Sequence, residues 1–476
     1  MRAPVHLFIN GAWHVGRAGA APVIDPATEQ ANGGVTLASR DDLDAAIAAA
    51  VGARASWGAM PAGERGAILT RAAMLLKERA NDVARALTLE QGKTLTESMG
   101  EVNRSVETLA WNGEEAGRAG GGTLPGRARN AIRSLVPSPI GVVAAFAAWN
   151  FPAVLATRKL GAALAAGCPV ILKAAEEAPY TAAAIVQCLA DAGVPAGAVN
   201  LVFGDPPMVA AHLLASPDVR KVTFTGSTRV GKELAKLAAP DLKRCTFELG
   251  GHAPVILCAD GNVDVAVTST MAFKFTSAGQ SCIAPSRFYI HRSRYAEFTD
   301  KFTAAAKALK VGNGFEQGIQ MGPVANARRL SAMQRLTDDA KAHGAEIAAG
   351  GQRHSAPGFF WSPTVLMQVP DEAAVMNEEP FGPIAPMAPF DEVDEAIARA
   401  NRVAYGFAAY CFTQSASIAA KFTAEIEAGN LGINQMSPSL PDAPVGGVKD
   451  SGYGYEGGRE GIAAFQHFKL VSQTFL

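Results

Sequence analysis

The sequence predicts an α/β protein with two domains, each built on a parallel β-sheet. Short apolar runs alternate with amphipathic helical stretches from residue 140 to 260, and the pattern returns from about 263 to 440. Strands separated by helices of this length are typical of βαβ units, in which helices cover both faces of a parallel sheet. The length of 476 residues exceeds what one ordinary core accommodates and favours two or three domains. We therefore expect a cleft between two α/β units.

Residues 40–115, which precede the first block, are predicted to be helical. Asp41 and Asp42 put acidic groups where the first helix would begin, which complements the helix dipole. Alanine-rich amphipathic segments follow at 64–79 and 82–91. This part of the chain should therefore add a group of helices to the first domain.

The first alternating block is predicted to hold strands joined by helices. The strands are expected at 140–147, 169–173, 199–203, 220–225 and 254–258. The helices are expected at 153–166, 179–192, 206–215 and 229–238. In the second block, helices at 295–310, 325–345, 392–402 and 415–428 lie between apolar strands.

A glycine-rich patch at 117–126 and a strand-like segment at 130–136 interrupt the first domain. The patch is either a plain flexible loop or part of an excursion away from that domain. The pattern does not choose between these two interpretations.

The composition favours a well-buried globule without a bulk electrostatic field. Apolar residues make up 49% of the chain and charged residues 18%, and the formal net charge is −1. Such a balance argues against a nucleic-acid or anionic-membrane partner. No window reaches the roughly 18 to 20 apolar residues of a membrane span, and the start, MRAPVHLFINGAW, resembles no signal or transit peptide.

The six cysteines are scattered and form neither a C-x-x-C pair nor a zinc-like pattern with histidine. In so long a chain they are expected to be reduced thiols rather than a disulfide framework. We therefore expect a cytoplasmic protein without a metal ion.

Cys282 stands out among the cysteines because Gly279 and Gln280 precede it and suggest a tight turn. Backbone N–H groups brought close to a thiol by such a turn depress its pKa and favour the nucleophilic thiolate. The alternative is that Cys282 is a small buried apolar residue.

Glu248 and Asn150 are candidates for further chemistry. Glu248 lies between apolar residues before a double glycine, where a carboxyl group titrates high and can act as a general base; a domain-boundary ion pair is the alternative. Asn150 ends an apolar strand, and its amide could stabilise an oxyanion. It could also cap the helix that Pro152 begins, and the two roles are compatible.

A candidate phosphate site follows the strand at 220–225. The segment Phe224-Thr225-Gly226-Ser227-Thr228-Arg229-Val230-Gly231 leaves a strand and opens a helix, whose N–H groups could hold an anion, although it is not a G-x-G-x-x-G fingerprint. Lys173 and Glu176 follow another strand and could bind ribose hydroxyls, or they could form a solvated loop pair.

Six motifs together resemble the aldehyde dehydrogenase superfamily, in its order and at about its spacing. They are Trp-Asn-Phe-Pro (149–152), Phe-Thr-Gly-Ser-Thr (224–228), Glu-Leu-Gly-Gly (248–251), Gly-Gln-x-Cys (279–282), Glu-Glu-Pro-Phe-Gly-Pro (378–383) and Gly-Gly-Val-Lys-x-Ser-Gly (446–452). The resemblance runs over nearly the whole chain.

The resemblance implies three structural units. They are a Rossmann-like NAD-binding domain (1–117 and 140–250), a catalytic domain (251–445) and a small β oligomerisation element (118–139 and 446–476). The family forms dimers or tetramers, so we expect a homodimer or homotetramer. The tail from Phe465 to Leu476 would pair across protomers.

The resemblance also implies a reaction. The Cys282 thiolate would attack an aldehyde to give a thiohemiacetal, whose oxyanion the Asn150 amide and the Cys282 N–H would hold. Hydride would then leave for the nicotinamide, and Glu248 would activate the water that hydrolyses the resulting thioester.

Seven residues match cofactor-binding positions of the family. They are Trp149, Lys173, Glu176, Gly226, Ser227, Glu379 and Phe381. An acidic group on the adenosine ribose would repel a 2′-phosphate, so NAD is favoured over NADP, although Lys173 could still receive that phosphate. Ala148 and Ala174 replace prolines that are frequent in the family, a change that removes backbone stiffness but no functional group.

Within the superfamily the chain is most similar to succinate-semialdehyde dehydrogenases. Arg158 and Arg287 match that group's carboxylate-binding arginines, and Ser439 matches a serine of its last substrate loop. Two guanidinium groups could clamp a substrate carboxylate. Alternatives are a solvated helix face for Arg158 and an interdomain ion pair for Arg287. Other substrates stay open: glutarate semialdehyde, or a small hydroxy- or aryl-aldehyde.

Three further expectations follow. Ala284 occupies the position where that group often has a second cysteine, so no disulfide redox switch is expected. A cysteine hydrolase is a competing function, because His252 could pair with a thiol. A catalytically silent homologue should lack Cys282, Glu248 or Asn150, and all three are present.

Overall fold

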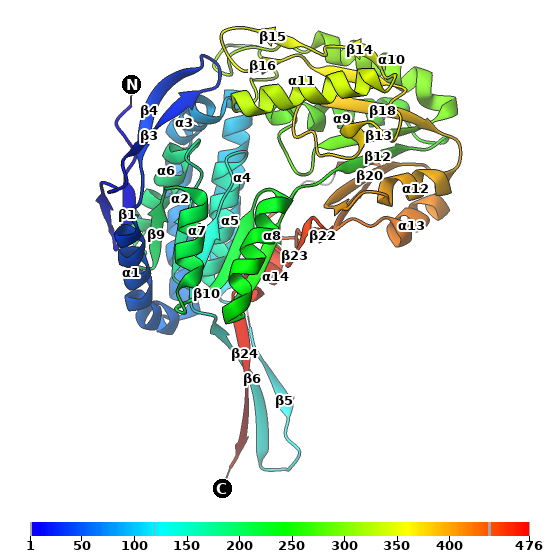
Figure 1. The fold of residues 1–476 in the computed structure, drawn as a ribbon. Helices are drawn as coiled ribbons and strands as arrows, with labels where there is room; N and C mark the ends of the chain where they lie inside the picture. The colour runs from blue at the N-terminus through cyan, green and yellow to red at the C-terminus, as the bar shows by residue number, and fades with distance from the viewer. Residues whose placement is uncertain (1, 119, 437–438, 476) are drawn as a thin grey trace.

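The computed structural model describes residues 2–118, 120–436 and 439–475. Two α/β lobes lie side by side, and a narrow three-stranded sheet projects from the first of them (Figure 1). The predicted class, α/β with two parallel sheets and a small β element, is confirmed. Ala119 in the glycine-rich patch and Leu476 at the end of the predicted tail lie outside the described residues.

Helices dominate the chain before the first parallel strands, as predicted. They are α1 (Arg40–Ala59), α2 (Ala62–Glu78), α3 (Ala80–Gln91) and α4 (Leu95–Ala116). Asp41 and Asp42 lie in the first turn of α1, where the Ser39 side chain and the Asp42 carboxylate form a capping box. Such reciprocal bonds satisfy N–H groups that have no partner within the helix, so the sequence marks this boundary locally.

An eight-stranded sheet forms the first lobe, in the order β2-β1-β9-β8-β7-β10-β11-β23. The five central strands, β9, β8, β7, β10 and β11, run parallel to one another. At the two edges of the sheet, β1, β2 and β23 are antiparallel to their neighbours. The strands are β1 (Leu7–Ile9), β2 (Ala12–His14), β7 (Val142–Phe146), β8 (Val170–Lys173), β9 (Val199–Val202), β10 (Val219–Thr225), β11 (Arg244–Glu248) and β23 (Gly452–Tyr453). Every residue of β7, β8 and β9 is buried, which explains their continuous apolar runs.

The predicted helices of the first lobe are confirmed within a residue or two of their ends. They are α5 (Pro152–Ala165), α6 (Pro179–Asp191), α7 (Pro206–Ala215) and α8 (Thr228–Ala238). Prolines occupy the first turn of α5, α6 and α7, where the missing N–H costs nothing. The strand β11 was not predicted, although it carries Glu248 at its end.

A seven-stranded sheet forms the second lobe, in the order β14-β17-β18-β13-β12-β20-β21. All neighbouring pairs run parallel except β14 with β17. The strands are β12 (Ala253–Leu257), β13 (Pro285–His291), β14 (Glu346–Ala349), β17 (Thr364–Met367), β18 (Ile384–Phe390), β20 (Ala408–Phe412) and β21 (Asn430–Ile433). The helices are α9 (Val263–Lys274), which was not predicted, α10 (Arg292–Ala308), α11 (Ala327–Ala342), α12 (Val393–Asn401) and α13 (Ala416–Glu425).

The projecting sheet joins two distant parts of the chain. Strand β6 (Ala131–Pro139) lies between β5 (Gly122–Pro125) and β24 (Gln466–Thr474), so the strand-like segment after the glycine-rich patch is an excursion from the first lobe. Val136, Phe468, Leu470 and Phe475 expose apolar side chains on it.

Residues 446–465, which we grouped with the oligomerisation element, lie elsewhere. Strand β23 pairs with β11 in the first sheet, and α14 (Gly458–Ala463) packs against α5. Only the last strand, β24, enters the projecting sheet. Within this stretch, β23 therefore extends the first sheet beside the strand that carries Glu248, while β22 pairs with β19.

The remaining short elements complete the fold. They are β3 (Ala20–Asp25), β4 (Gln30–Thr36), β15 (Arg353–Ser355), β16 (Phe360–Trp361), β19 (Tyr405–Gly406), β22 (Val448–Lys449), η1 (Ala239–Asp241), η2 (Thr276–Gly279) and η3 (Ala374–Met376). All six cysteines are free thiols. In the part of the chain that the structure describes, no helix is long and apolar enough to cross a membrane.

The parallel strands bring predicted site residues to one edge of the first sheet. Lys173 ends β8, Thr225 ends β10 and Glu248 ends β11, while Asn150 follows β7. Ligands of open α/β sheets bind outside the carboxyl ends of the strands. This edge faces the second lobe through the short link from Glu248 to β12, so the site is expected between the lobes.

Candidate active site

A cavity of about 450 Å³ lies at this edge. Its volume is in the range of small-molecule sites. Most of the predicted residues line it: Trp149, Asn150, Gly226, Ser227, Glu248, Cys282, Glu379 and Phe381. The two sheets thus bring together residues that are more than two hundred positions apart in the sequence.

Cys282 comes from a strained loop that links α9 to β13. Ser277 and Ala278 have φ values of 51° and 52°, a left-handed conformation that non-glycine residues rarely adopt. Gly279 follows at φ 72°, where an added Cβ would lie 2.3 Å from the carbonyl oxygen of Gly382. The loop is therefore held by its surroundings, and it delivers Cys282 half-buried to the cavity.

The electrostatics around Cys282 oppose a free thiolate. Burial raises the pKa of the thiol, and the negative charges of Glu248 and Glu379 raise it further, while Arg158 opposes them. A nucleophile in this setting must lose its proton as it reacts. A nearby base is therefore part of any mechanism that uses Cys282.

Glu248 has the properties of such a base. Its side chain is 3% exposed, and Oε1 has no hydrogen-bond partner among the described residues. Burial, reinforced by the negative charge of Glu456, raises the pKa of Glu248 to about 8. A carboxyl group with this pKa can both accept and release a proton near neutral pH.

Two charged neighbours of Glu248, Glu456 and Lys159, were not predicted from the sequence. Glu456 accepts hydrogen bonds from Lys159 and from Thr223 Oγ1, the latter at 3.1 Å. Burial alone would raise the pKa of Glu456, but Lys159 and Arg158 lower it, so Glu456 carries the negative charge beside Glu248. No local signal marks Glu456, because only the fold of the last forty residues brings it to this point.

Asn150 uses its side chain across the cleft rather than on its own helix. Its Nδ2 donates to the carbonyl oxygen of Gln280 at 3.1 Å. The N-cap of α5 is Phe151, with no side-chain cap. The helix-cap alternative for Asn150 is therefore wrong, because its amide points to the loop that carries Cys282.

Glu379 and Phe381 line the opposite wall of the cavity. Glu379 Oε1 accepts the Gly251 N–H at 3.0 Å, and burial raises its pKa to about 7. The rings of Phe381 and Trp149 pack edge to face, with their centres 5.6 Å apart. The guanidinium carbon of Arg329 lies 5.6 Å from the centre of the Phe381 ring. Arg329 was not predicted.

The segment that we predicted to bind phosphate lies at the start of α8 and lines the cavity. Ser227 is the N-cap of this helix, and Gly226, Ser227 and Arg229 line the cavity together with Arg328 and Arg329. A helix N-terminus and three guanidinium groups suit an anionic ligand. The donor set therefore fits the diphosphate of a dinucleotide, and Glu379 offers a carboxylate for a ribose.

Lys173 and Glu176 lie beside this cavity rather than in its lining. Lys173 Nζ donates to Glu176 Oε2 at 2.7 Å, and Glu176 Oε1 accepts the Gly204 N–H at 2.8 Å. Glu176 lines a neighbouring cavity of about 410 Å³. The two residues do pair with each other, as the alternative of a solvated loop pair proposed, but the Lys173 side chain is buried rather than solvated.

Arg158 and Ser439 come together, although 281 residues separate them. The Arg158 guanidinium donates to the hydroxyl of Ser439 and, at 3.1 Å, to its carbonyl oxygen. Arg158 is 7% exposed, and its Nε has no partner among the described residues. Its charge acts on the pKa of both Glu248 and Cys282. The solvated-face alternative for Arg158 is therefore wrong.

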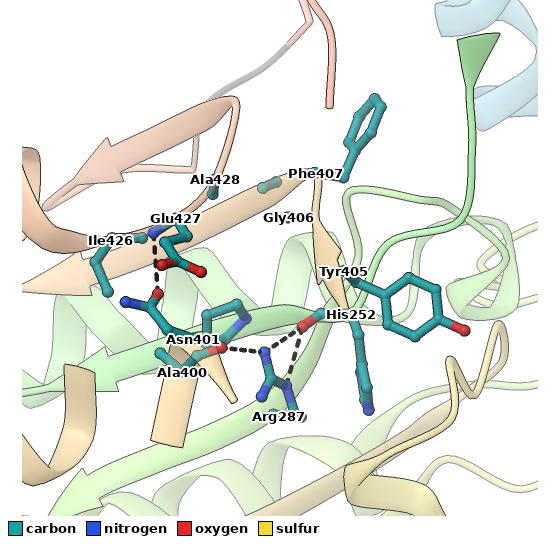
Figure 2. Close-up of a pocket in the computed structure, with 12 residues that line it drawn as sticks. His252, Arg287, Ala400, Asn401, Tyr405, Gly406, Phe407, Ile426, Glu427 and Ala428 are labelled. Atoms are coloured by element: carbon teal, nitrogen blue, oxygen red, sulfur yellow. Dashed lines mark hydrogen bonds between the residues drawn. The ribbon is translucent and has the colours of Figure 1, made fainter. Parts of the chain in front are cut away.

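Arg287 does not lie at this site, and its predicted role as a second substrate clamp is wrong. Its side chain is 1% exposed and donates to the carbonyl oxygens of His252 at 2.8 Å and Ala400 at 2.9 Å (Figure 2). A further bond reaches the carbonyl oxygen of Arg399 at 3.1 Å. The N–H groups of Arg287 thus donate to main-chain carbonyl oxygens, because β13 directs the side chain toward the end of α12. The interdomain ion pair is also absent among its described contacts.

His252 belongs to the same buried cluster as Arg287. Its Nδ1 lies 2.9 Å from Ser286 Oγ, and its ring packs against Tyr405 (Figure 2). Burial and the charge of Arg287 lower its pKa well below the usual value, so it is neutral. The geometry pairs His252 with Ser286 and not with Cys282, which removes the basis of the cysteine-hydrolase alternative.

Comparisons with known proteins identify the family of the chain. The model of the Aldehyde dehydrogenase family matches residues 13–471. The chain is 47% identical to 4-(hydroxymethyl)benzenesulfonate dehydrogenase of Comamonas testosteroni, over 98% of this chain and 97% of the relative. It is 39% identical to succinate-semialdehyde dehydrogenase [NADP(+)] of Escherichia coli, over 98% and 96%. A crystal structure of succinate-semialdehyde dehydrogenase from Burkholderia pseudomallei superposes with a TM-score of 0.97 at 39% identity, covering 99% of this chain and 98% of that one.

Proposed function

The chain belongs to the aldehyde dehydrogenase family, and from that premise we propose that it oxidises a small anionic aldehyde to the carboxylate with NAD. Family members use NAD or NADP. The proposal rests chiefly on one observation: Cys282, Glu248 and Asn150 line a single cavity together with Glu379.

The first half of the proposed reaction uses Cys282 and Asn150. Because burial raises the pKa of the thiol, its proton passes to Glu248 as the sulfur attacks the carbonyl carbon. The oxyanion of the thiohemiacetal is held by Asn150 Nδ2 and the Cys282 N–H. The nicotinamide, when bound, accepts the hydride that leaves the substrate carbon.

The second half releases the acid from Cys282. After hydride transfer, Glu248 releases to solvent the proton that it took from the thiol; its carboxylate, with a pKa of about 8, then removes a proton from water as that water attacks the thioester carbonyl. Asn150 again stabilises the oxyanion, and as that intermediate collapses the C–S bond breaks and the Cys282 sulfur takes the proton that Glu248 removed from water. Ser451 supports the base, since its hydroxyl donates to the Gly250 carbonyl oxygen at 2.7 Å.

The anionic end of the substrate is assigned to Arg158 and Ser439. Their mutual contact, the burial of the guanidinium and its unpartnered Nε support this role. With Arg287 excluded, one guanidinium rather than two serves the substrate. Succinate semialdehyde, with glutarate semialdehyde as its longer homologue, is the first candidate.

A sulfonated aryl aldehyde is the second candidate. Two observations favour it: the 47% identity to 4-(hydroxymethyl)benzenesulfonate dehydrogenase, and the aromatic groups near Cys282. Tyr410 donates to the carbonyl oxygen of Ile283 at 2.7 Å, and its ring lies 6.4 Å from that of Phe273. Tyr410 is fully buried, so the half-buried Phe273 is the ring of this pair that a substrate ring would meet, and a sulfonate would bind Arg158 as a carboxylate does.

A panel of aldehydes tests the proposal. We would compare kcat/KM for succinate semialdehyde, glutarate semialdehyde and 4-sulfobenzaldehyde with that for butanal and benzaldehyde, using NAD and NADP. Each anionic aldehyde that fits should exceed its uncharged analogue about tenfold to a hundredfold, the worth of one charge-assisted contact. Equal values for charged and uncharged partners would reject the anion-binding role.

NAD preference, assembly and location complete the proposal. Glu176 would repel the 2′-phosphate of NADP, whereas the Escherichia coli relative is named for NADP(+), so the panel decides between NAD and NADP.

The apolar side chains on β24 support a homodimer or homotetramer. Six free thiols support a reducing, cytoplasmic location.

A further inference from the structure

The junction between α3 and α4 lies against both lobes of the molecule. Gly92 ends α3 with φ 94°, and an added Cβ there would lie 2.8 Å from Pro323 of the second lobe. The Leu95 N–H that begins α4 donates to the carbonyl oxygen of Gly314 at 2.9 Å. Lys93 lies between these two contacts. The junction is therefore fixed at the base of the cleft, and the functions described above assign it no role.

Lys93 and Glu101 form a buried ion pair within this junction. Their side chains are both 0% exposed, and Lys93 Nζ lies 2.5 Å from Glu101 Oε2. Burial of two charges is costly, and an apolar pair of similar size is often as stable. Stability alone therefore does not explain why this pair is present, and its other contacts are more informative.

Those contacts lie at Asn150 and at the residues that follow it. Lys93 Nζ donates to the main-chain carbonyl oxygen of Asn150 at 2.8 Å and lies 4.0 Å from the centre of the Phe151 ring. Glu101 Oε1 accepts the Ala153 N–H at 2.8 Å, in the first turn of α5. Because α5 has no side-chain cap of its own, Glu101 supplies one from a different helix.

The same junction also holds the loop that carries Cys282. Glu97 Oε1 accepts the Ser277 N–H at 2.8 Å, and Gln91 Nε2 donates to Ser277 Oγ at 3.2 Å. Ser277 is one of the two left-handed residues of that loop. A strained backbone persists only where its surroundings determine it, and here the surroundings include the helices that hold Asn150.

We propose that Lys93 and Glu101 are positioning residues, which fix the Asn150 amide relative to Cys282 so that it meets the developing oxyanion. An oxyanion donor acts only at hydrogen-bond distance from the oxygen that becomes charged. A misplacement of about 1 Å can cost about a hundredfold in rate. This inference rests on the proposed role of Asn150.

A double-mutant cycle tests it. The variant Lys93→Met/Glu101→Leu removes both charges together, so that neither is left unpaired in the interior. With the best aldehyde of the panel and saturating NAD, its single-turnover rate of NADH formation should fall about tenfold to a hundredfold, with KM changed less than about threefold. In an Asn150→Ala background the same pair of substitutions should have little further effect, because the group it positions is gone.

A matched control separates positioning from general damage to the helices. Thr88 and Ser98 join α3 to α4 by a buried hydroxyl contact of 2.8 Å that touches neither Asn150 nor Ser277. Thr88→Val/Ser98→Ala should keep the wild-type rate. If the double variant does not fold, Lys93→Arg retains the charge pair but alters the donor geometry, and it should show the same non-additivity with Asn150→Ala.

The outcomes distinguish the two proposals. An unchanged rate in Asn150→Ala would reject the role of Asn150 itself. If Asn150→Ala lost most of the rate of NADH formation but Lys93→Met/Glu101→Leu kept the wild-type rate, only the positioning role would be rejected. Additive losses, or an equal loss in the Thr88→Val/Ser98→Ala control, would also overturn it.

Discussion

Gly251 packs directly on the carbonyl oxygen of Cys282: a Cβ added to Gly251 would lie 2.3 Å from that oxygen. The segment that follows Glu248 therefore touches the main chain of Cys282, so the candidate base and nucleophile are held by one close contact. A side chain at position 251 would push the two segments apart.

Gly251→Ala should accordingly lower kcat by about a hundredfold, since a shift of about 1 Å between reacting groups has effects of this size. Cys282 should also change its rate of alkylation by iodoacetamide. Gly52→Ala is the matched control, because no atom lies within 4 Å of a Cβ at that helical position. A fully active Gly251→Ala enzyme would show that the contact does not matter for the reaction.

The rate of thioester hydrolysis should change with pH as the Glu248 carboxyl group ionises. Its pKa of about 8 means that the ionised base forms as the pH rises through that value, so the rate should increase there and then level off. Glu248→Gln should abolish this limb.

Glu456→Gln should move the same limb to lower pH. Glu456 raises the pKa of Glu248 by its negative charge, so removing that charge favours the ionised form of Glu248 at a lower pH. The unpaired ammonium of Lys159 would act in the same direction. The measurement is the pH profile of kcat, and a shift to higher pH would contradict this explanation.

Arg158→Gln should affect anionic substrates selectively. We expect kcat/KM for the preferred anionic aldehyde to fall about tenfold to a hundredfold, as one charge-assisted contact is lost, while butanal is oxidised at nearly the original rate. Because the Arg158 charge also lowers the pKa of Glu248, the comparison should be made on the pH-independent plateau. Equal losses for both aldehydes would argue for a purely structural Arg158.

Arg287→Met should destabilise the protein without changing substrate preference. The substitution leaves the buried carbonyl oxygens of His252 and Ala400 without their donor, at a cost of about 1 to 3 kcal/mol each. Thermal unfolding should therefore begin at a lower temperature, and the ratio of kcat/KM for anionic and uncharged aldehydes should stay the same. If kcat/KM fell for the anionic aldehyde alone, Arg287 would bind the substrate after all, contrary to what the structure indicates.

Glu176→Ala should increase the use of NADP. Removing this carboxylate eliminates its repulsion of a 2′-phosphate and releases Lys173, now 2.7 Å from Glu176, to bind that phosphate. The ratio of kcat/KM for NADP to that for NAD should rise at least about tenfold. Glu297→Ala is the control, because Glu297 pairs with Lys301 on the exposed side of α10 and lines neither cavity. An unchanged ratio in Glu176→Ala would contradict the assignment.

Strands β7, β8, β9 and β10 and helices α5 to α8 of the first lobe could be predicted because their signals are local, whereas the edge strands β1, β2 and β23 were not predicted. Continuous apolar runs mark strands that are buried on both faces, and prolines mark the first turns of α5, α6 and α7. Strand β11 was missed, because its alternating residues between Arg244 and Glu248 do not form such a run. Cys282, Glu248 and Asn150 could be named because each lies in a short motif.

The sequence by itself thus determined the fold class and the family, and it named the candidates for the reacting groups. The tertiary structure decided which charged residues join them. Arg287 lies five residues from Cys282 but points to main-chain acceptors, because its direction depends on strand β13 and on the end of α12. Arg158 and Ser439, or Glu248 and Glu456, meet only when distant segments pack together. Local patterns set backbone conformation, whereas contacts between distant side chains depend on how the whole chain closes.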